Sequence, residues 1–229
     1  MKAKSTIIVV ALMLLTNCAS YYPQGVDIPL IKEKGDIRID AGYFLAPNFQ
    51  GSTNFGGNAT ISAGLTNMLA VQGYASTDML FRSHLQGALG LFKGFENKTV
   101  MEMYAGYGYG AGLESDNSSN KIRNSYHLAF TQFNIGKTDL GGSHIDYGLG
   151  LKGGYLHNNN LVEISDNSPF QKRNGYIVEP SVFFRFGGKK VKFSTRVNYL
   201  WTEAIRSDYY FPLSVSLGVN FHLGRTKSK

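Results

Sequence analysis

Residues 213–223 read LSVSLGVNFHL and alternate strictly between apolar residues and polar or small ones. The apolar members are Leu213, Val215, Leu217, Val219, Phe221 and Leu223. Successive side chains of a β-strand point to opposite faces, so this stretch predicts a strand with one apolar face and one polar face.

The same alternation recurs nine more times upstream. The ten predicted strands cover residues 36–45, 58–66, 69–77, 83–92, 99–113, 124–136, 144–156, 175–187, 190–201 and 212–223. Connectors after even-numbered strands are short, whereas most of those after odd-numbered strands are longer and polar, with 78–82 as the exception. Short turns at one end, long loops at the other and an even strand number are typical of a barrel in an outer membrane.

The predicted fold class is all-β: a closed antiparallel up-and-down transmembrane β-barrel of about ten strands, formed by residues 36–224. The alternative is an eight-stranded barrel, which would form if two weaker segments, such as 83–92, belong to loops. The rival fold is a soluble β-domain on a lipid tether. A soluble sandwich, however, is not expected to have short connectors after even-numbered strands and long ones after odd-numbered strands.

The tightest turn gives a prediction of register. With Gly188-Lys189 as a two-residue hairpin loop, Phe186 lies opposite Val191 and apolar residues meet on one face. Aromatic residues are predicted to form two belts at the lipid–water interfaces. The outer belt contains Tyr176, Tyr199, Trp201, Tyr209, Tyr210 and Phe211, and the periplasmic belt contains Phe92, Phe186 and Phe221.

The other face of the strands is polar and is predicted to line the lumen. Its members are Arg38, Asp40, Gln72, His84, Gln86, Glu102, Asp146, Lys152, Glu179, Arg185, Lys192, Arg196, Asn198 and His222. Charges in a narrow lumen should pair, and the hairpin register makes Glu179 and Arg196 diagonal neighbours, which predicts an interior ion pair. We favour structural filling of the lumen over a polar path or selectivity ring, because small barrels fill with side chains.

Glycine occupies every second position of residues 106–112, next to Tyr107 and Tyr109. A phosphate-binding glycine loop needs a strand-to-helix turn, and no helix is predicted here. The run therefore predicts lumen positions without side chains behind a lipid-facing row of tyrosines.

Residues 1–35 are predicted to lie outside the barrel. Lys2 and Lys4 precede an apolar run at residues 7–15, which is too short to span a bilayer as a helix, so residues 1–17 are interpreted as a secretory signal peptide.

The stretch Leu15-Thr16-Asn17-Cys18 resembles a bacterial lipobox. The resemblance implies that Cys18 becomes the first residue of the mature chain and carries acyl groups such as palmitate. Residues 18–35 would then be a lipidated tether, and residues 225–229 a basic C-terminal tail. The alternative is an ordinary signal peptide with an incidental cysteine.

The sequence does not predict a catalytic, cofactor or metal site. Cys18 is the only cysteine, which excludes a cysteine metal site, and the five histidines show no pair at metal-ligand spacing. An enzyme with a site at the extracellular rim stays open, since His157 and Asp208 both lie on that side, but no nucleophile motif supports it.

The surplus of positive charge gathers at the periplasmic ends of the strands. Removal of Lys2 and Lys4 lowers the formal net charge from +7 to +5, from 21 basic and 16 acidic residues. The basic residues at these ends are Lys32, Lys34, Lys93, Lys98, Lys137, Lys189, Lys190, Lys192, Arg225, Lys227 and Lys229. Such a rim would attract anionic lipid head groups or simply keep the end soluble. Nucleic acid is not expected as a partner, because no binding motif is present.

A family resemblance extends over the whole chain. Cys18, Tyr21-Tyr22-Pro23, Pro29-Leu30, Lys34-Gly35-Asp36 and the turn Leu65-Thr66-Asn67 resemble small outer-membrane β-barrel lipoproteins of Bacteroidota. The resemblance implies a lipid-anchored barrel of uncharacterised role with no catalytic residues. Acidic residues after the cysteine, which resemble a surface-export signal in that group, are missing from Ala19-Ser20-Tyr21, which favours an anchor in the inner leaflet.

Three functions follow from these observations. The first is a non-enzymatic envelope protein that is structural or binds an extracellular ligand or envelope protein through its long loops, especially residues 157–174. The alternatives are a narrow outer-membrane channel and an outer-membrane enzyme.

Overall fold

Eleven β-strands and one 3₁₀ turn make up the regular structure of the described residues in this computed structural model. The structure describes residues 27–47, 53–78, 83–115, 121–160, 174–204 and 212–224. The strands are β1 (Ile37–Pro47), β2 (Thr53–Gly64), β3 (Leu69–Asp78), β4 (Ser83–Gly94), β5 (Thr99–Ser115), β6 (Lys121–Lys137), β7 (Asp146–Asn160), β8 (Gly175–Gly187), β9 (Val191–Tyr199), β10 (Trp201–Thr202) and β11 (Leu213–His222), with η1 (Leu140–Gly142) between β6 and β7. β10 continues β9 past Leu200, so the wall has ten strands.

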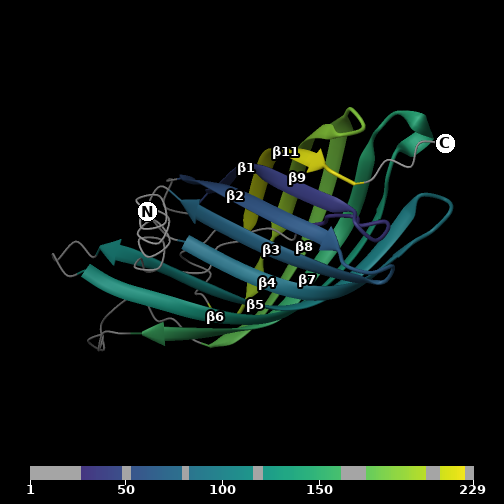
Figure 1. Cartoon of the computed structure of the whole chain (residues 1–229). Helices are drawn as coiled ribbons and strands as arrows, with labels where there is room; N and C mark the ends of the chain where they lie inside the picture. Colours follow the sequence, from purple (N-terminus) through teal and green to yellow (C-terminus); the bar gives the residue numbers. More distant parts are fainter. Residues whose placement is uncertain are drawn as a thin grey trace, which may run out of the picture.

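The strands form one closed antiparallel sheet (Figure 1). Each strand from β1 to β8 pairs with the next in sequence, and β11 pairs with both β9 and β1. The pairing of β1 with β11 closes the barrel, which confirms the predicted all-β, up-and-down topology. Closure leaves no free sheet edge, as a wall surrounded by hydrocarbon requires.

Each of the ten predicted segments contains a strand. The weaker segment 83–92 is β4, so the eight-stranded alternative is wrong. Several strands continue into the predicted loops: β2 begins at Thr53 rather than at residue 58, and β6 begins at Lys121. Backbone pairing needs no apolar alternation, so a hairpin can extend past the point where the sequence pattern stops.

The connectors are sorted between the two ends of the barrel. We call the end with connectors 65–68, 95–98, 138–145 and 188–190 the turn end, and the opposite end the loop end. The two longest connectors, 161–174 and 203–212, both lie at the loop end. The start of β1 and the end of β11 lie at the turn end.

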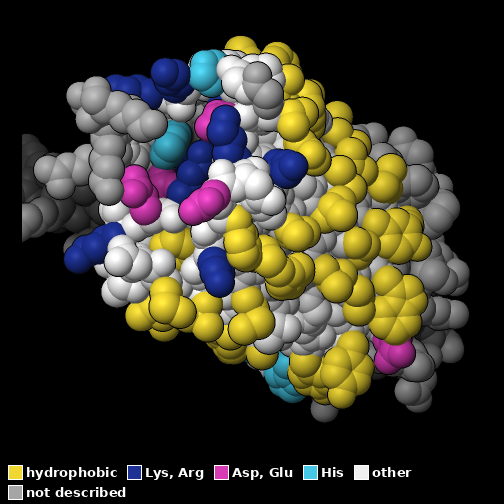
Figure 2. Space-filling model, turned by 90° about the vertical axis from the view of Figure 1, so that its right-hand side faces the viewer, with side chains coloured by type: hydrophobic (Ala, Val, Ile, Leu, Met, Phe, Trp, Pro, Cys, Tyr) yellow, Lys and Arg dark blue, Asp and Glu magenta, His cyan; other side chains and the backbone are white. Residues whose placement is uncertain are grey.

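The outer surface of the wall is apolar. Exposure alternates along the strands, and the outward positions Phe184, Val197 and Leu217 are 41%, 41% and 60% exposed. Figure 2, a view of the turn end, shows the apolar side chains covering the wall beside a compact charged cluster. A continuous apolar exterior around a polar interior is the reverse of a soluble sandwich, and it identifies a transmembrane β-barrel. No helix in the described ranges is long and apolar enough to cross a membrane.

The register between β8 and β9 differs from the prediction by two residues. Phe186 pairs with Phe193, not with Val191, because the turn is wider and Gly188 N–H donates to the carbonyl of Val191 at 2.7 Å. Gly187 supports this turn with a φ of 148°. A shift of two residues keeps every side chain on its face, so alternation cannot distinguish the two registers.

At the described positions the aromatic belts agree with the prediction except at Phe92, while Tyr209, Tyr210 and Phe211 lie outside the described residues. Tyr176, Tyr199 and Trp201 are exposed near the loop end, and Phe186 and Phe221 are exposed near the turn end. Phe92, in contrast, is 4% exposed and faces the lumen. It shares the inward parity of His84 and Gln86 in β4, and it belongs to an interior apolar cluster.

Candidate functional site

The candidate site is the lumen, which polar side chains fill. The predicted inward residues are buried at 7% exposure or less, with the exception of His222, whose side chain is 28% exposed at the turn end. These fourteen residues therefore lie where the alternation predicted. Gln132 and Asn134, which belong to the same inward row of β6, were missed although the alternation of residues 124–136 could have found them.

A segment before β1 enters the lumen from the turn end. Asp27, Ile28, Leu30 and Ile31 are 2%, 0%, 0% and 0% exposed. Residues 27–31 of the predicted tether at residues 18–35 are thus buried inside the barrel, whereas residues 33–35 are exposed. Residues 18–26 of the tether with Cys18, the signal peptide and the tail at 225–229 lie outside the described residues. We call residues 27–36 the lumen segment.

The backbone of the lumen segment is held by side chains of the wall. The carbonyl oxygen of Asp27 accepts hydrogen bonds from Gln132 Nε2 at 2.6 Å and Gln72 Nε2 at 3.3 Å. Arg185 Nη2 donates to the carbonyl of Ile28 at 2.8 Å, and Ile31 N–H donates to Glu102 Oε1 at 2.7 Å. These bonds satisfy backbone groups that irregular chain would otherwise leave unpaired in the interior.

Apolar contacts hold the same segment. Ile28 and Leu30 form an interior cluster with Val100 and Phe183 of the wall, and Ile31 joins the larger cluster that contains Phe92. Leu30 adopts a left-handed conformation with φ 57°, which is uncommon for a residue other than glycine. The packing on both sides holds the backbone in this conformation.

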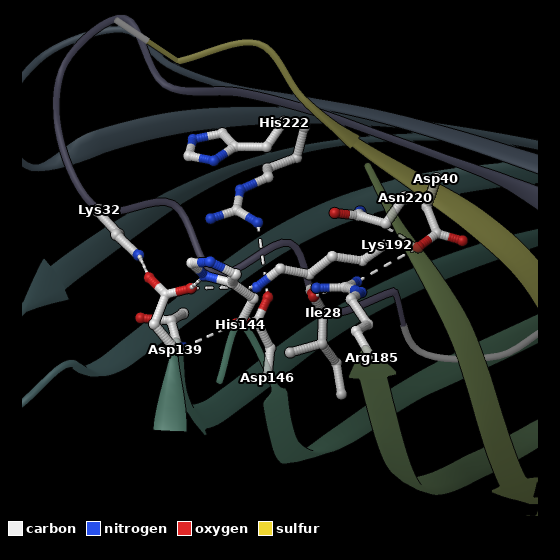
Figure 3. A network of polar contacts seen from close by, with 12 residues as sticks. Ile28, Lys32, Asp40, Asp139, His144, Asp146, Arg185, Lys192, Asn220 and His222 are labelled. Carbon is white, nitrogen blue, oxygen red and sulfur yellow. Dashed lines mark hydrogen bonds and ion pairs between the residues drawn. The ribbon is translucent and has the colours of Figure 1, made fainter. Parts of the chain in front are cut away.

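The carboxylate of Asp27 completes a buried charge cluster. Arg196 Nη2 lies 3.4 Å from Asp27 Oδ1 and 3.4 Å from Asp40 Oδ1. Arg185 Nη2 lies 3.4 Å from Asp40 Oδ2 and 4.0 Å from Asp27 Oδ1. Without Asp27, these two guanidinium groups would share the single carboxylate of Asp40. Figure 3 shows the contacts of Arg185 with Asp40 and with the carbonyl of Ile28.

The lumen segment also changes the charge balance of the interior. The wall contributes five buried cations, which are Arg38, Lys152, Arg185, Lys192 and Arg196, each at most 5% exposed. It contributes four equally buried acids, which are Asp40, Glu102, Asp146 and Glu179. Two more, Asp27 and Asp36, come from the segment. A buried charge needs a partner, and Asp27 and Asp36 of the segment pair with Arg185, Arg196 and Arg38 of the wall.

A second charge cluster closes the turn end. Lys192 Nζ lies 2.6 Å from Asp146 Oδ1 and 3.3 Å from Asp139 Oδ1, while Lys32 Nζ lies 3.4 Å from Asp139 Oδ2 (Figure 3). Partial burial would raise the pKa of Asp139, but the charges of Lys32 and Lys192 outweigh it and hold the pKa at about 2. Asp139 therefore stays ionised under all ordinary conditions.

A cavity of about 390 Å³ opens beside this cluster at the turn end. Its lining includes Lys189 and Lys190 of the β8–β9 turn, which are exposed, and His144 and His222. His222 Nε2 lies 2.5 Å from Asp36 Oδ1. The described lysines of the predicted basic rim do lie at this end, but Lys192 is buried at 5% exposure and ion-paired, so it is part of the lumen rather than the rim.

Glu179 and Arg196, the predicted interior ion pair, are both buried, and their described ion pairs are with other residues. Glu179 Oε2 lies 3.7 Å from Lys152 Nζ, directly across the β7–β8 pairing, and Arg196 binds Asp27 and Asp40. The wider turn moves Arg196 opposite Phe183, away from the predicted diagonal position. Lys152 was on the predicted inward face, whereas Asp27 gave no periodic signal.

On the side of β4, β5 and β6, the lumen toward the loop end is filled by aromatic side chains. A Cβ atom on Gly110 would lie 2.0 Å from the ring of Tyr126, and one on Gly108 would lie 2.8 Å from the ring of His84. Tyr126 Oη contacts His84 Nδ1 at 2.9 Å. The glycine run thus has the role that its alternation predicts: it leaves space inside the wall, while Tyr107 points outward at 55% exposure.

The described residues do not assemble the alternative enzyme site. His157 is exposed in β7, where it pairs with His127 of β6, and Asp208 lies outside the described residues. His127 contacts Tyr107 Oη at 2.5 Å. Within the described ranges, no group of histidine, cysteine and carboxylate side chains has the arrangement of a metal site.

Comparisons with known proteins add a likeness of fold. No family model and no curated protein matches the chain. The outer membrane protein OprG from Pseudomonas aeruginosa is 12% identical over 87% of this chain and 100% of that chain, with a TM-score of 0.42. The autotransporter AIDA-I transport unit from Escherichia coli is 10% identical over 92% and 96% of the two chains, with a TM-score of 0.43. The NanC porin is 10% identical over 82% and 98%, with a TM-score of 0.43.

The assignment of fold rests on the chain itself. Its ten-strand closure and its outward apolar surface are those of an outer-membrane β-barrel.

Proposed function

We propose that this protein is a lipid-anchored outer-membrane β-barrel that does not conduct solutes and acts as a non-enzymatic envelope protein. One observation carries the proposal: the lumen segment and its two charge clusters occupy the interior at the turn end. A barrel closed in this way offers its long loops and its outer surface to partners, rather than a path through its centre.

The loops are the proposed binding surface. Connectors 161–174 and 203–212 are the two longest connectors and lie at the same end. Binding residues are found disproportionately on loops that a rigid scaffold positions. The partner would be an extracellular ligand or another envelope protein.

The lysines of the turn end are proposed to bind anionic lipid head groups. Lys93, Lys98, Lys189 and Lys190 are exposed there. Each lysine near an anionic surface contributes roughly 1 kcal/mol of attraction. Cys18 is the proposed lipid anchor.

Reconstitution in planar bilayers tests the non-conducting state. We expect no conductance steps from the wild type, while the same preparation shows the heat-dependent gel migration of a folded membrane barrel. Steady conductance would contradict the proposal and favour the narrow channel.

The lipid anchor has its own test. Metabolic labelling with radioactive palmitate should mark the wild type and not a Cys18→Ala variant. Equal labelling of the two proteins would remove lipidation from the proposal and leave the barrel unaffected.

The enzymatic alternative requires His157. Lipid-modification and proteolysis assays should give the same background values for the wild type and a His157→Ala variant. Activity that this substitution removes would overturn the non-enzymatic role.

A further inference from the structure

We propose that the lumen conducts the N-terminus of this chain toward the loop end, so that acylated Cys18 anchors the protein from the outer face of the membrane. The inference rests on the proposed outer-membrane orientation and lipid anchor. It reverses the sequence-based expectation of an anchor in the inner leaflet.

The direction of the lumen segment is the first observation. At one end, Asp36 lies level with the turn end: Gly64 N–H donates to its carbonyl at 2.9 Å, and Gly64 is the last residue of β2. At the other end, the carbonyl of Asp27 is bound by Gln72 and Gln132, which lie well inside β3 and β6. Followed toward the N-terminus, the chain therefore runs from the turn end into the barrel.

The remaining length of chain is sufficient. Asp27 lies at the level of Asp40, because Arg196 binds both carboxylates, and Pro47 at the loop end is seven positions further along β1 than Asp40 (47 − 40). At about 3.3 Å per residue and a tilt of about 40°, this is roughly 18 Å of height. Residues 18–26 number nine and can span about 30 Å when extended.

A return to the turn end would meet a closed layer. Arg38, Asp146 and Lys192 lie between Asp27 and the cavity at the turn end, at 3%, 0% and 5% exposure. Lys192 and Arg38 both lie within 4 Å of Asp146, at 2.6 Å and 3.8 Å. A second pass of the chain would have to break these ion pairs.

The lumen beyond Asp27 contains polar groups suited to a peptide backbone. Asn58 Nδ2, Gln86 Nε2 and Ser216 Oγ are buried and make no hydrogen bond. Asn58 pairs with Gly42 and Ser216 pairs with Phe44, so both lie on the loop-end side of Asp40. A buried donor without a partner costs about 1–3 kcal/mol, and carbonyl groups of a passing chain would provide acceptors.

These groups lie on a side of the lumen where many inward side chains are small. Besides Asn58 and Ser216, that side carries Thr60 of β2 and Ser76 of β3, and its larger inward side chains are Phe44 and Tyr74. The large apolar cluster with Tyr126, Phe130, Leu156 and Ile177 comes from β6, β7 and β8. The two walls therefore differ, and the small polar wall marks the route.

Site-directed thiol labelling on intact cells tests the route in the full chain. Acylation blocks Cys18, so a Ser20→Cys variant has one reactive thiol next to the anchor. An Asn167→Cys variant reports the loop end, and a Lys189→Cys variant reports the turn end. A membrane-impermeant maleimide is added before and after permeabilisation.

We expect Ser20→Cys to label on intact cells to at least half the extent of Asn167→Cys, while Lys189→Cys labels only after permeabilisation. Labelling of Ser20→Cys only after permeabilisation, or in neither state, overturns the inference. If Cys18 of the wild type itself reacts, the anchor proposal fails, and the side on which it reacts still decides the route. Equal labelling of Asn167→Cys and Lys189→Cys on intact cells would instead contradict the proposed orientation.

Discussion

The two halves of the lumen are filled by different means. Toward the turn end, buried cations and carboxylates pair across the interior, and two of those carboxylates, Asp27 and Asp36, belong to the lumen segment. Toward the loop end, glycines of β5 leave space that Tyr126 and His84 occupy. The same alternation of inward and outward residues underlies both halves, so alternation sets which face a residue takes and leaves open what fills the interior.

The largest expected effect is the loss of Asp40 from the charged half. Asp40 contacts Arg185 and Arg196, and it accepts hydrogen bonds from Ser194 and Asn220. An Asp40→Ala variant leaves two buried guanidinium groups with Asp27 alone, which should reduce the free energy of unfolding by about 3–5 kcal/mol. Fluorescence of Trp201, the only tryptophan, reports unfolding in denaturant.

The matched control is Asp40→Asn, which keeps the size of the side chain and one acceptor oxygen and removes the charge. The Asp40→Asn variant should lose less free energy of unfolding than the Asp40→Ala variant. If both variants unfold at the wild-type denaturant concentration, the charge cluster does not stabilise this half.

The aromatic half should be sensitive to added volume instead. A Gly110→Ala methyl group would meet the ring of Tyr126, so we expect a loss of about 1–3 kcal/mol by the same fluorescence assay. Gly87→Ala is the control, because nothing lies within 4 Å of its Cβ position on the outer face of β4. Equal stability of the two variants would mean that the interior at Gly110 is not tightly packed.

The hydrogen bond between Tyr126 and His84 contributes less to the stability of the aromatic half than the packing at Gly110 does. With Gln86 Oε1 facing His84 Nε2 at 3.2 Å, Nε2 carries the proton and Nδ1 accepts from Tyr126. A Tyr126→Phe variant keeps the ring and removes the donor, which should cost about 1 kcal/mol. A loss as large as that of Gly110→Ala would indicate that the hydroxyl does more than donate to His84.

The smallest effect is a pH dependence at the turn end. The pKa of Asp139 falls from its ordinary 3.8 to about 2 in the folded barrel, so its stabilising contribution is complete above pH 3.8 and is lost as the pH falls through 2. This side chain is 32% exposed, which limits the contribution to about 1 kcal/mol or less.

An Asp139→Asn variant should therefore be slightly less stable than the wild type at pH 5, and the difference should shrink toward pH 2. Denaturant midpoints at three pH values measure it. A constant difference would assign the effect to a contact that does not depend on ionisation.

The sequence predicts the wall well because the alternation of outward apolar and inward polar residues repeats along every strand. Alternation places Phe184 and Leu217 outside and Lys152 and Glu179 inside, and the structure has them there. It cannot fix register beyond a multiple of two, which is why Phe186 meets Phe193 rather than Val191. The turn chemistry of Gly187 and Gly188 decides that shift.

The lumen segment could not be predicted in the same way. Asp27 and Ile28 precede the first strand, and neither belongs to a periodic pattern. Their burial depends on Gln132, Arg185 and Arg196, which three different strands contribute from distant parts of the chain. The interior ion pairs could not be predicted for the same reason. Arg196 of β9 pairs with Asp27 and Asp40 across the lumen, and not with a residue of its own hairpin.

The seam between β1 and β11 has a consequence for assembly. It joins residues 182 positions apart, such as Ile39 and Phe221 (221 − 39), so the ring closes only when the last strand has been made. The lumen segment directly precedes β1, whereas its partners Arg185 and Arg196 belong to β8 and β9. The late strands β8 and β9 therefore close around a segment that precedes β1 in the chain. A chain truncated before β11 would expose two unpaired sheet edges and be prone to aggregate.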